Sequence, residues 1–311
     1  MALSIQSNMA SMSIQNQLGR SNNDLSTALE RLGSGFKINS AKDDAAGLQI
    51  ASRLNAQVRG QDAALYNSNN AMSMMQTAEG AFDEMTNIAY RMKELATQAA
   101  NGTNGGDEGI ALNAEYLALG DELASIMQNT SFGGTKLLAI DVAANVAAGA
   151  GVRATTASAV GKFSNTAAPA VTFQVGSSTA ETLDVNVFAA LNTIHTTLGT
   201  KTGSQTGMSN LLTPAGATTA TTGAMDVIDG LIKNIGTARS SLGASMNRLD
   251  HTMNNVTNMK ENTQAAASTL MDADFAAETS NMTKQQLLMN SGISVLSTAN
   301  STTQMIGSLL R

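Results

Sequence analysis

The chain has 311 residues and a formal net charge of −6, with 42% apolar, 14% charged and only 3% aromatic residues and no cysteine. The acidic balance offers no basic surface for nucleic acid or an anionic membrane, so neither is expected as a partner. The absence of cysteine excludes disulfides and cysteine-based metal or redox sites. With 18 methionines but few aromatic residues, thin helical seams are favoured over a thick globular core.

Near the N-terminus, apolar residues recur every seven positions at Leu18, Leu25 and Leu32. This period is typical of a coiled-coil seam, because it keeps one stripe of a helix facing a partner. We expect the helix to end at Gly33 or Gly35, where glycine adopts a positive φ at little cost. A second helix is expected to begin with Ser40 as its N-cap.

This second helix is predicted over about 44–100, which would make it roughly 85 Å long and the molecule elongated. A third is predicted to end near Asn129, with rows of apolar residues at seven-residue spacing. These rows are Ile110, Leu117 and Ala124, and beside them Leu112, Leu119 and Ile126.

Between 139 and 223 the seven-residue repeat is lost and Ala, Gly, Ser and Thr dominate, which is typical of an inserted segment. Alternating apolar residues on either side of a Gly-Ser-Ser-Thr turn predict a β-hairpin near 171–188. The sequence does not predict the fold of 139–170 or of 190–223.

The strongest repeat follows Gly223, at Ile228, Ile235, Leu242, Leu249 and Val256. A final helix is predicted from an apolar row at Phe275, Met282, Met289 and Leu296. These helices need partners to cover their apolar stripes.

Several runs carry a family resemblance. The segment Leu32–Ala51 (LGSGFKINSAKDDAAGLQIA) resembles the N-terminal signature of bacterial flagellin, the subunit of the flagellar filament. Glu94–Asn104, Phe132–Leu138, Phe173–Gly176 and Ala238–Asp250 resemble further flagellin motifs in the same order.

The fold class expected is mainly α, an elongated coiled-coil-like bundle of paired N- and C-terminal segments with a small insertion containing a β-hairpin. The expected domains are a terminal polymerisation domain (1–42 and 270–311), a central rod (43–138 and 224–269) and a variable insertion (139–223). The terminal segments could pair antiparallel or side by side.

The resemblance implies a structural subunit that self-assembles into the helical filament used for swimming, located outside the cell and exported without a cleavable signal peptide. The alternative is a secreted coiled-coil binding protein or a relative from the hook-filament junction. More apolar stripe is present than one thin molecule can cover, which independently indicates contact with other copies.

Residues expected to mediate self-assembly share the apolar rows of the two ends. They are Leu18, Leu25, Leu32, Phe275, Met282, Met289, Leu296, Ile306, Leu309 and Leu310.

By resemblance, a vertebrate innate immune receptor would contact Arg91, Leu95 and Glu115. The other partners implied are further flagellin copies, an export chaperone on the C-terminal helix, the filament cap and the hook-junction proteins.

No catalytic, cofactor or metal site is expected, and the protein is not expected to be an enzyme. His195 and His251 have no second ligand at a suitable spacing. The acidic pairs Asp43-Asp44 and Asp272-x-Asp274 stand at expected helix starts, where carboxylates are favourable.

Overall fold

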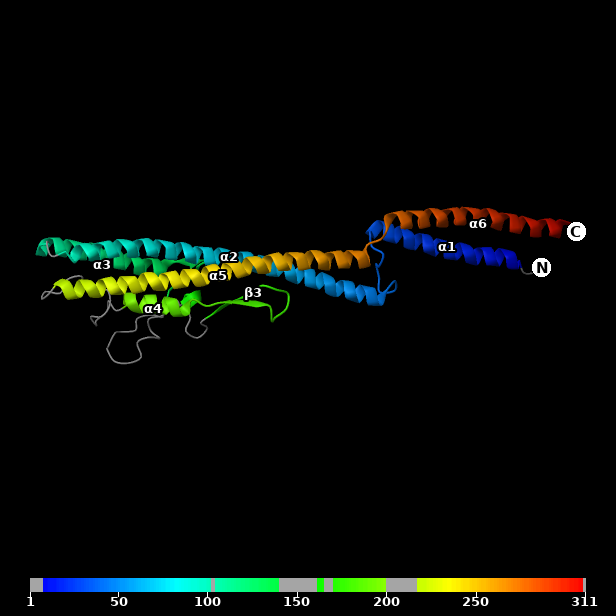
Figure 1. Ribbon diagram of the computed structural model, residues 1–311. Helices are drawn as coiled ribbons and strands as arrows, with labels where there is room; N and C mark the ends of the chain where they lie inside the picture. The colour runs from blue at the N-terminus through cyan, green and yellow to red at the C-terminus, as the bar shows by residue number, and fades with distance from the viewer. Residues whose placement is uncertain (1–7, 102–103, 140–160, 165–169, 200–216, 310–311) are drawn as a thin grey trace. The chain divides into compact units, whose positions relative to one another are not determined.

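The computed structural model describes residues 8–101, 104–139, 161–164, 170–199 and 217–309 (Figure 1). The chain divides into two compact units, Met1–Arg59 with Met259–Arg311, and Gly60–Asn258. We call them the terminal unit and the central unit. The described residues are mainly helical with two small antiparallel strand pairs, so the predicted fold class is confirmed.

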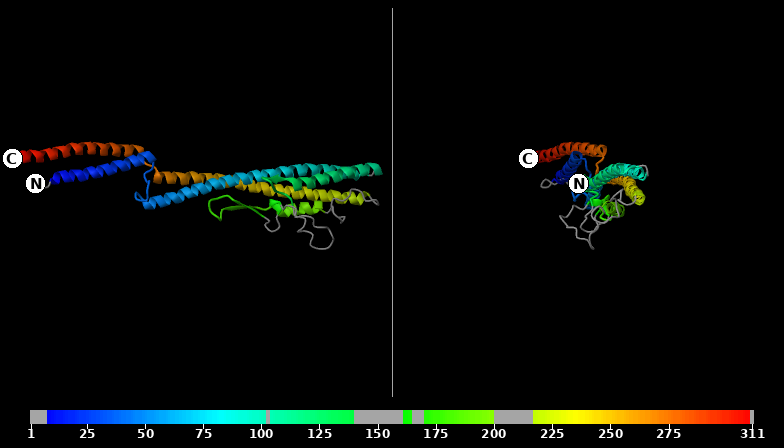
Figure 2. Two further views of the ribbon diagram at one scale, coloured as in Figure 1. Left: turned by 180° about the vertical axis from the view of Figure 1, so that it is seen from behind. Right: turned by 90° about the vertical axis from the view of Figure 1, so that its left-hand side faces the viewer.

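Two helices dominate the terminal unit, α1 (Met9–Ser34) and α6 (Phe275–Leu309). They lie side by side and antiparallel, with the N- and C-terminal ends of the chain at the same end of the pair (Figures 1 and 2). The two long helices α2 (Ala45–Ala99) and α5 (Ala217–Met271) contribute residues to both units. The boundaries expected at 42 and 270 fall close to helix ends, whereas the two units divide inside α2 and inside α5.

We use the name joint for residues 34–44 together with 271–274. Gly35 ends α1 with a φ of 77°, and its N–H donates to the carbonyl of Arg31 at 2.9 Å. A glycine with positive φ therefore ends this helix, as predicted. Backbone contacts then hold the two chain segments of the joint together. They are the bridge between Phe36 and Asp272, the bond from Lys37 N–H to Met271 O (2.6 Å) and the bond from Ala273 N–H to Gly35 O (2.9 Å).

The predicted N-cap of α2 is wrong by four residues. The side chain of Asp44, not that of Ser40, accepts from the first turn, since its Oδ1 receives the N–H of Gly47 at 2.9 Å. Asp43 instead closes the preceding turn by accepting the N–H groups of Ser40 (3.0 Å) and Asn39 (3.2 Å). These bonds lower the pKa of Asp43, and the bond from Ser40 N–H has the largest effect.

The central unit has one apolar core shared by α2, α3 (Gly106–Asn129), α4 (Phe188–Gly199) and α5. The repeat predicted along α5 is confirmed: Ile228, Ile235, Leu242 and Leu249 are fully buried and Val256 is 6% exposed. A strict seven-residue spacing therefore identified the buried face of this helix correctly.

In α3 the predicted face is partly wrong. Ile110 is 64% exposed, and Leu117 and Ala124 are only half-buried. The fully buried face carries Tyr116 and Leu123 instead. These two residues precede Leu117 and Ala124 by one position, so the buried face lies about 100° from that row. It adjoins the second predicted row, whose Leu112, Leu119 and Ile126 are partly buried against the core.

Two short hairpins accompany the helices. In the first, β1 (Ser131–Phe132) and β2 (Thr135–Lys136) are joined through Gly133 and Gly134, which both have positive φ. The second is the predicted hairpin, formed by β3 (Val171–Gln174) and β4 (Thr182–Val185) with Phe173 opposite Leu183. A 3-10 turn (η2, Lys162–Ser164) and α4 were not predicted.

Tyr116 places a hydroxyl in the core without a hydrogen-bond partner, and burial raises the pKa of this phenol to about 12. The folded state resists ionisation, so stability is full below the unfolded pKa of about 10 and falls as the pH rises toward 12. We expect Tyr116→Phe to remove this loss and to stabilise the protein by about 1 kcal/mol or more at pH 7, because an unsatisfied buried hydroxyl disappears.

Thermal unfolding of both forms at pH 7, 10 and 11.5 tests this expectation. Tyr66→Phe is the control, since the side chain of Tyr66 is 69% exposed. An equal fall in melting temperature for wild type and Tyr116→Phe above pH 10 would contradict it.

Candidate functional site

Side-chain contacts distributed along α1 and α6 hold the two helices together. Residues later in α1 contact residues earlier in α6, as antiparallel pairing requires. The amide of Asn8 donates to the carbonyl of Ala299 at 3.2 Å, near the chain ends. Midway, Gln285 donates to Asp24 at 3.5 Å. These contacts, with the joint at the other end, fix one antiparallel register.

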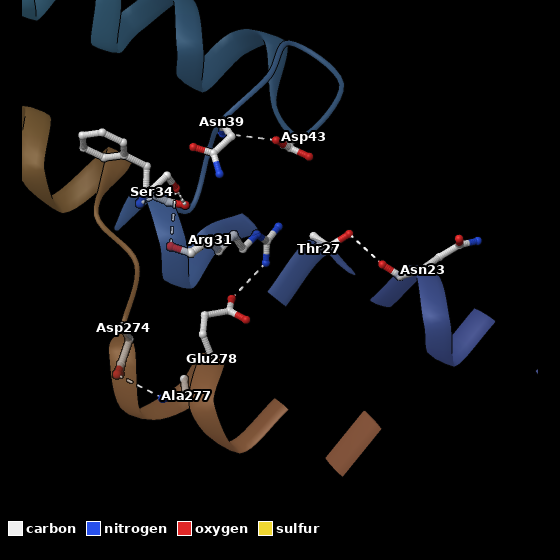
Figure 3. Close-up of polar contacts among 10 residues, drawn as sticks. Asn23, Thr27, Arg31, Ser34, Asn39, Asp43, Asp274, Ala277 and Glu278 are labelled. Atoms are coloured by element: carbon white, nitrogen blue, oxygen red, sulfur yellow. Dashed lines mark hydrogen bonds and ion pairs between the residues drawn. The ribbon is translucent and has the colours of Figure 1, made fainter. Parts of the chain in front are cut away.

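Arg31 and Glu278 form the strongest of these links (Figure 3). Nη1 of Arg31 lies 3.0 Å from Oε1 of Glu278, and the two side chains are 29% and 12% exposed. Glu278 stands in the first turn of α6, where the helix dipole favours a carboxylate. Asp274 caps the same turn by accepting the N–H groups of Ala276 (2.9 Å) and Ala277 (3.2 Å).

The seam between the two helices is narrow. Leu18, Leu25 and Leu32 are half-buried, and small residues of α1 fill the buried positions between them. These small residues are Ser11, Ser21 and Ala28. On α6, Gly292 lies so close to Leu18 that an added Cβ would stand 2.8 Å from its Cδ2.

The predicted self-assembly residues therefore have different surroundings. The leucines of α1 and the row Met282, Met289 and Leu296 of α6 are half-buried within the chain's own helix pair. Phe275, expected in that row, is 62% exposed at the first position of α6. The side chains of Ile306 and Leu309, and the whole of Leu310, lie outside the described residues.

Apart from Phe275, the apolar residues on the outer faces of α6 were missed by sequence reasoning. Leu288 and Val295 are seven positions apart and share one direction, while Leu287 and Met305 are eighteen apart, which is five full turns, and share another. Phe275 and Ile293 define a third direction by the same spacing. Their exposed fractions are 44% (Leu288), 50% (Val295), 65% (Leu287), 60% (Met305), 62% (Phe275) and 56% (Ile293).

A helix with apolar residues in all directions is normally surrounded by other protein. The 35 residues of α6 carry only two charged side chains, Glu278 and Lys284, so little charge opposes its burial. The eighteen-residue spacing could have revealed two of these rows, and the seven-residue spacing of Leu288 and Val295 the third. The longer repeat of Phe275, Met282, Met289 and Leu296 conceals them.

The central unit contains a second candidate, an exposed charged cluster on α2 and α3. The Nη2 and Nε of Arg91 both contact Oε1 of Glu115, at 2.8 and 3.0 Å, and Nη1 contacts Oε2 of Glu94 at 3.0 Å. Glu115 and then Glu94 raise the pKa of Arg91. The structure thus brings two of the predicted receptor-contact residues together, whereas Leu95 is fully buried in the core.

No group of three or more His, Cys, Asp or Glu side chains capable of holding a metal ion occurs in the described ranges. His195 is half-buried on α4, and burial lowers its pKa. Among the helices that the structure describes, none combines the length and apolarity needed to span a membrane.

Comparison with known proteins agrees with this architecture. Residues 5–143 match the bacterial flagellin N-terminal helical region, and residues 225–310 match the bacterial flagellin C-terminal helical region. Polar flagellin C of Vibrio parahaemolyticus is 34% identical over an alignment of 384 residues that spans 100% of both chains. Flagellin A of Vibrio anguillarum is 35% identical over 379 aligned residues, again with 100% of each chain covered.

One solved structure shares the fold, that of a flagellar hook-associated protein from Vibrio parahaemolyticus. It is 15% identical, with a TM-score of 0.53, and the match covers 74% of this chain and 99% of that one.

These matches and the paired terminal helices define a helical structural protein of the bacterial flagellum. The chain belongs to the bacterial flagellin family. It is accordingly a structural subunit of the flagellar filament, which lies outside the cell and serves motility, and the binding-protein alternative is not favoured.

The contact between Gly292 and Leu18 predicts opposite effects for two glycine substitutions. Gly292→Ala should push Leu18 out of place. The overpacking should weaken the helix pair by about 1–3 kcal/mol, and the higher helix propensity of alanine should offset about 1 kcal/mol of this loss. Gly19→Ala, the matched control on α1, meets nothing within 4 Å and should stabilise the helix by about 0.5–1 kcal/mol.

Amide hydrogen exchange along α1 and α6 measures both effects locally. Faster exchange in Gly292→Ala and slower exchange in Gly19→Ala are expected. A shift of the same sign in both variants would mean that Gly292 has no packing role.

Proposed function

We propose that the outer apolar rows of α6, with the exposed methionines and Leu29 of α1, are the surface through which copies of this filament subunit contact one another. The carrying observation is that α6 has apolar residues in all directions, although α1 covers only one of them. Burying one such side chain contributes roughly 1.5–3 kcal/mol, and a filament repeats this contribution at every subunit.

The separate directions of the rows suit an open assembly. Leu288 with Val295 and Phe275 with Ile293 lie in different directions around α6, so more than one neighbouring copy can be contacted at once. Contacts between unlike surfaces that do not close produce a helical filament rather than a ring. Self-polymerisation of the family is consistent with this arrangement.

The same apolar surface supports a proposal for the partners implied by resemblance. Before assembly, a chaperone would bind the C-terminal helix and cover the apolar surface of α6. In the filament, the cap and the hook-junction proteins would contact the terminal helices of this subunit. Export without a cleaved signal peptide stays a prediction from the resemblance.

The charged cluster supports a separate proposal, that Arg91 and Glu115 contact a vertebrate innate immune receptor. Their side chains are each 46% exposed and hold one another in place. Leu95 would act from within the core, by packing there and fixing the position of this part of α2.

The assembly proposal is tested by replacing Leu288 and Val295 with Ser. We expect filament growth to fail, because two apolar contacts per subunit are lost while the seam with α1 keeps its residues. Seeded polymerisation followed by light scattering measures growth, and circular dichroism of the monomer checks that the helices remain.

Thr283→Ala with Thr298→Ala is the matched control on the same helix, since both threonines are exposed. Normal growth of the Leu288/Val295 variant would refute the proposed surface. Failure of the threonine control as well would show that any change to α6 disrupts assembly.

For the receptor proposal, Arg91→Ala combined with Glu115→Ala should abolish receptor signalling by the monomer, because both exposed contact groups disappear. Lys93→Ala on the same helix serves as the control; Lys93 pairs with Asp229 of α5 and lies in another direction. A reporter assay in receptor-expressing cells measures signalling, and an unchanged response of the double variant would overturn the assignment.

A further inference from the structure

Two sets of methionines contrast in exposure. In the central unit the side chains of Met74, Met75, Met85, Met92 and Met127 are at most 8% exposed and belong to the core. In the terminal unit Met9 is 69% exposed, Met12 54% and Met305 60%. A chain without cysteine has methionine as its most oxidisable side chain, so this exposure has a chemical consequence.

The three exposed methionines lie at one end of the terminal helix pair. The bond from Asn8 to Ala299 sets the first turn of α1, with Met9 and Met12, beside α6 only six residues before Met305. Figure 1 shows the N- and C-terminal ends together at this place. Met282 and Met289 belong to the same helix pair but are half-buried in its seam.

We propose that Met9, Met12 and Met305 are oxidation sites, at which peroxide converts the exposed thioethers to sulfoxides and thereby blocks assembly. The sulfur lone pair attacks one oxygen of hydrogen peroxide, a sulfur–oxygen bond forms, the oxygen–oxygen bond breaks, and the second oxygen leaves as water. Sulfur is oxidised by two electrons and the peroxide is reduced by two, so no other reactant is needed.

The effect on assembly rests on the proposed function of the outer surface of the helix pair. A sulfoxide is polar and accepts hydrogen bonds, so burying it against an apolar neighbour leaves its oxygen unsatisfied. Each oxidised methionine that becomes buried should raise the critical concentration for polymerisation roughly tenfold, the change expected for one unsatisfied polar group. Methionine sulfoxide reductases reverse the change, so the block is reversible.

The first experiment uses the wild-type chain treated with limiting hydrogen peroxide. Peptide mass spectrometry should find sulfoxide first at Met9, Met12 and Met305, later at Met259, which is 37% exposed, and last at the core methionines. Seeded polymerisation of the partly oxidised sample should leave the three sulfoxides in the soluble fraction and deplete them from the filaments. Equal sulfoxide content in both fractions would overturn the proposal.

The second experiment uses the triple variant Met9→Leu, Met12→Leu and Met305→Leu, since leucine keeps the apolar volume and resists oxidation. After peroxide it should polymerise as before treatment, whereas Met259→Leu, the control, should lose polymerisation like wild type. Reductase treatment of the oxidised wild type should restore growth.

Loss of growth by the oxidised triple variant would overturn the proposal, because other methionines would then be responsible. The two proposals fail differently. If untreated wild type grows on seeds and its oxidised form also grows, the oxidation proposal is refuted alone. If the unoxidised Leu288/Val295 variant assembles normally, the proposed assembly surface is refuted by itself.

Discussion

The antiparallel register of α1 on α6 is the constraint on which the terminal unit depends. Contacts distributed along the pair support one register, from the bond between Asn8 and Ala299 to the ion pair of Arg31 with Glu278. A shift by one residue would move Leu18 away from Gly292 and break these contacts together. Since the ion pair is partly buried, leaving either charge without its partner would be costly, which opposes such a shift.

This register explains why the same two helices present both a seam and an outer surface. The seam is filled by half-buried leucines and by Ser11, Ser21 and Ala28, so it buries little apolar area for its length. Larger side chains such as Leu287, Leu288 and Ile293 are directed elsewhere. The helix pair therefore keeps much of its apolar surface for other molecules, which suits a subunit of a filament.

Sequence reasoning succeeded where one periodic signal dominated. The row from Ile228 to Leu249 is fully buried, and Gly35, one of the two glycines expected to end α1, does so with a positive φ that glycine adopts at little cost. It failed where neighbouring residues compete. Asp44 caps α2 although Ser40 has equal capping chemistry, and in α3 Tyr116 is buried although the seven-residue repeat identifies Leu117.

Contacts across long separations were also beyond the sequence alone. Arg91 and Glu115 were identified by resemblance, but nothing in their separation of 24 positions predicts that they pair. Glu94, only three positions from Arg91, is a local partner that was not recognised. Helix α4 was missed because its three threonines and one asparagine among twelve residues hide the buried pair Leu191 and Ile194. The exposed rows of α6 were missed because two of them have residues eighteen positions apart, and the third, Leu288 with Val295, stands beside the longer row through Met282 and Met289.

The antiparallel pairing also has a consequence for the order of events during synthesis. Asn8 and its partner Ala299 are 291 positions apart, and Arg31 is 247 positions from Glu278. A ribosome makes α6 long after α1, so α1 waits through the synthesis of the whole central unit before the helix it pairs with exists. Contacts that close such long loops form slowly, because the entropy of loop closure is lost before they stabilise the chain. In the nascent chain α1 thus stays without its partner helix until α6 has been made.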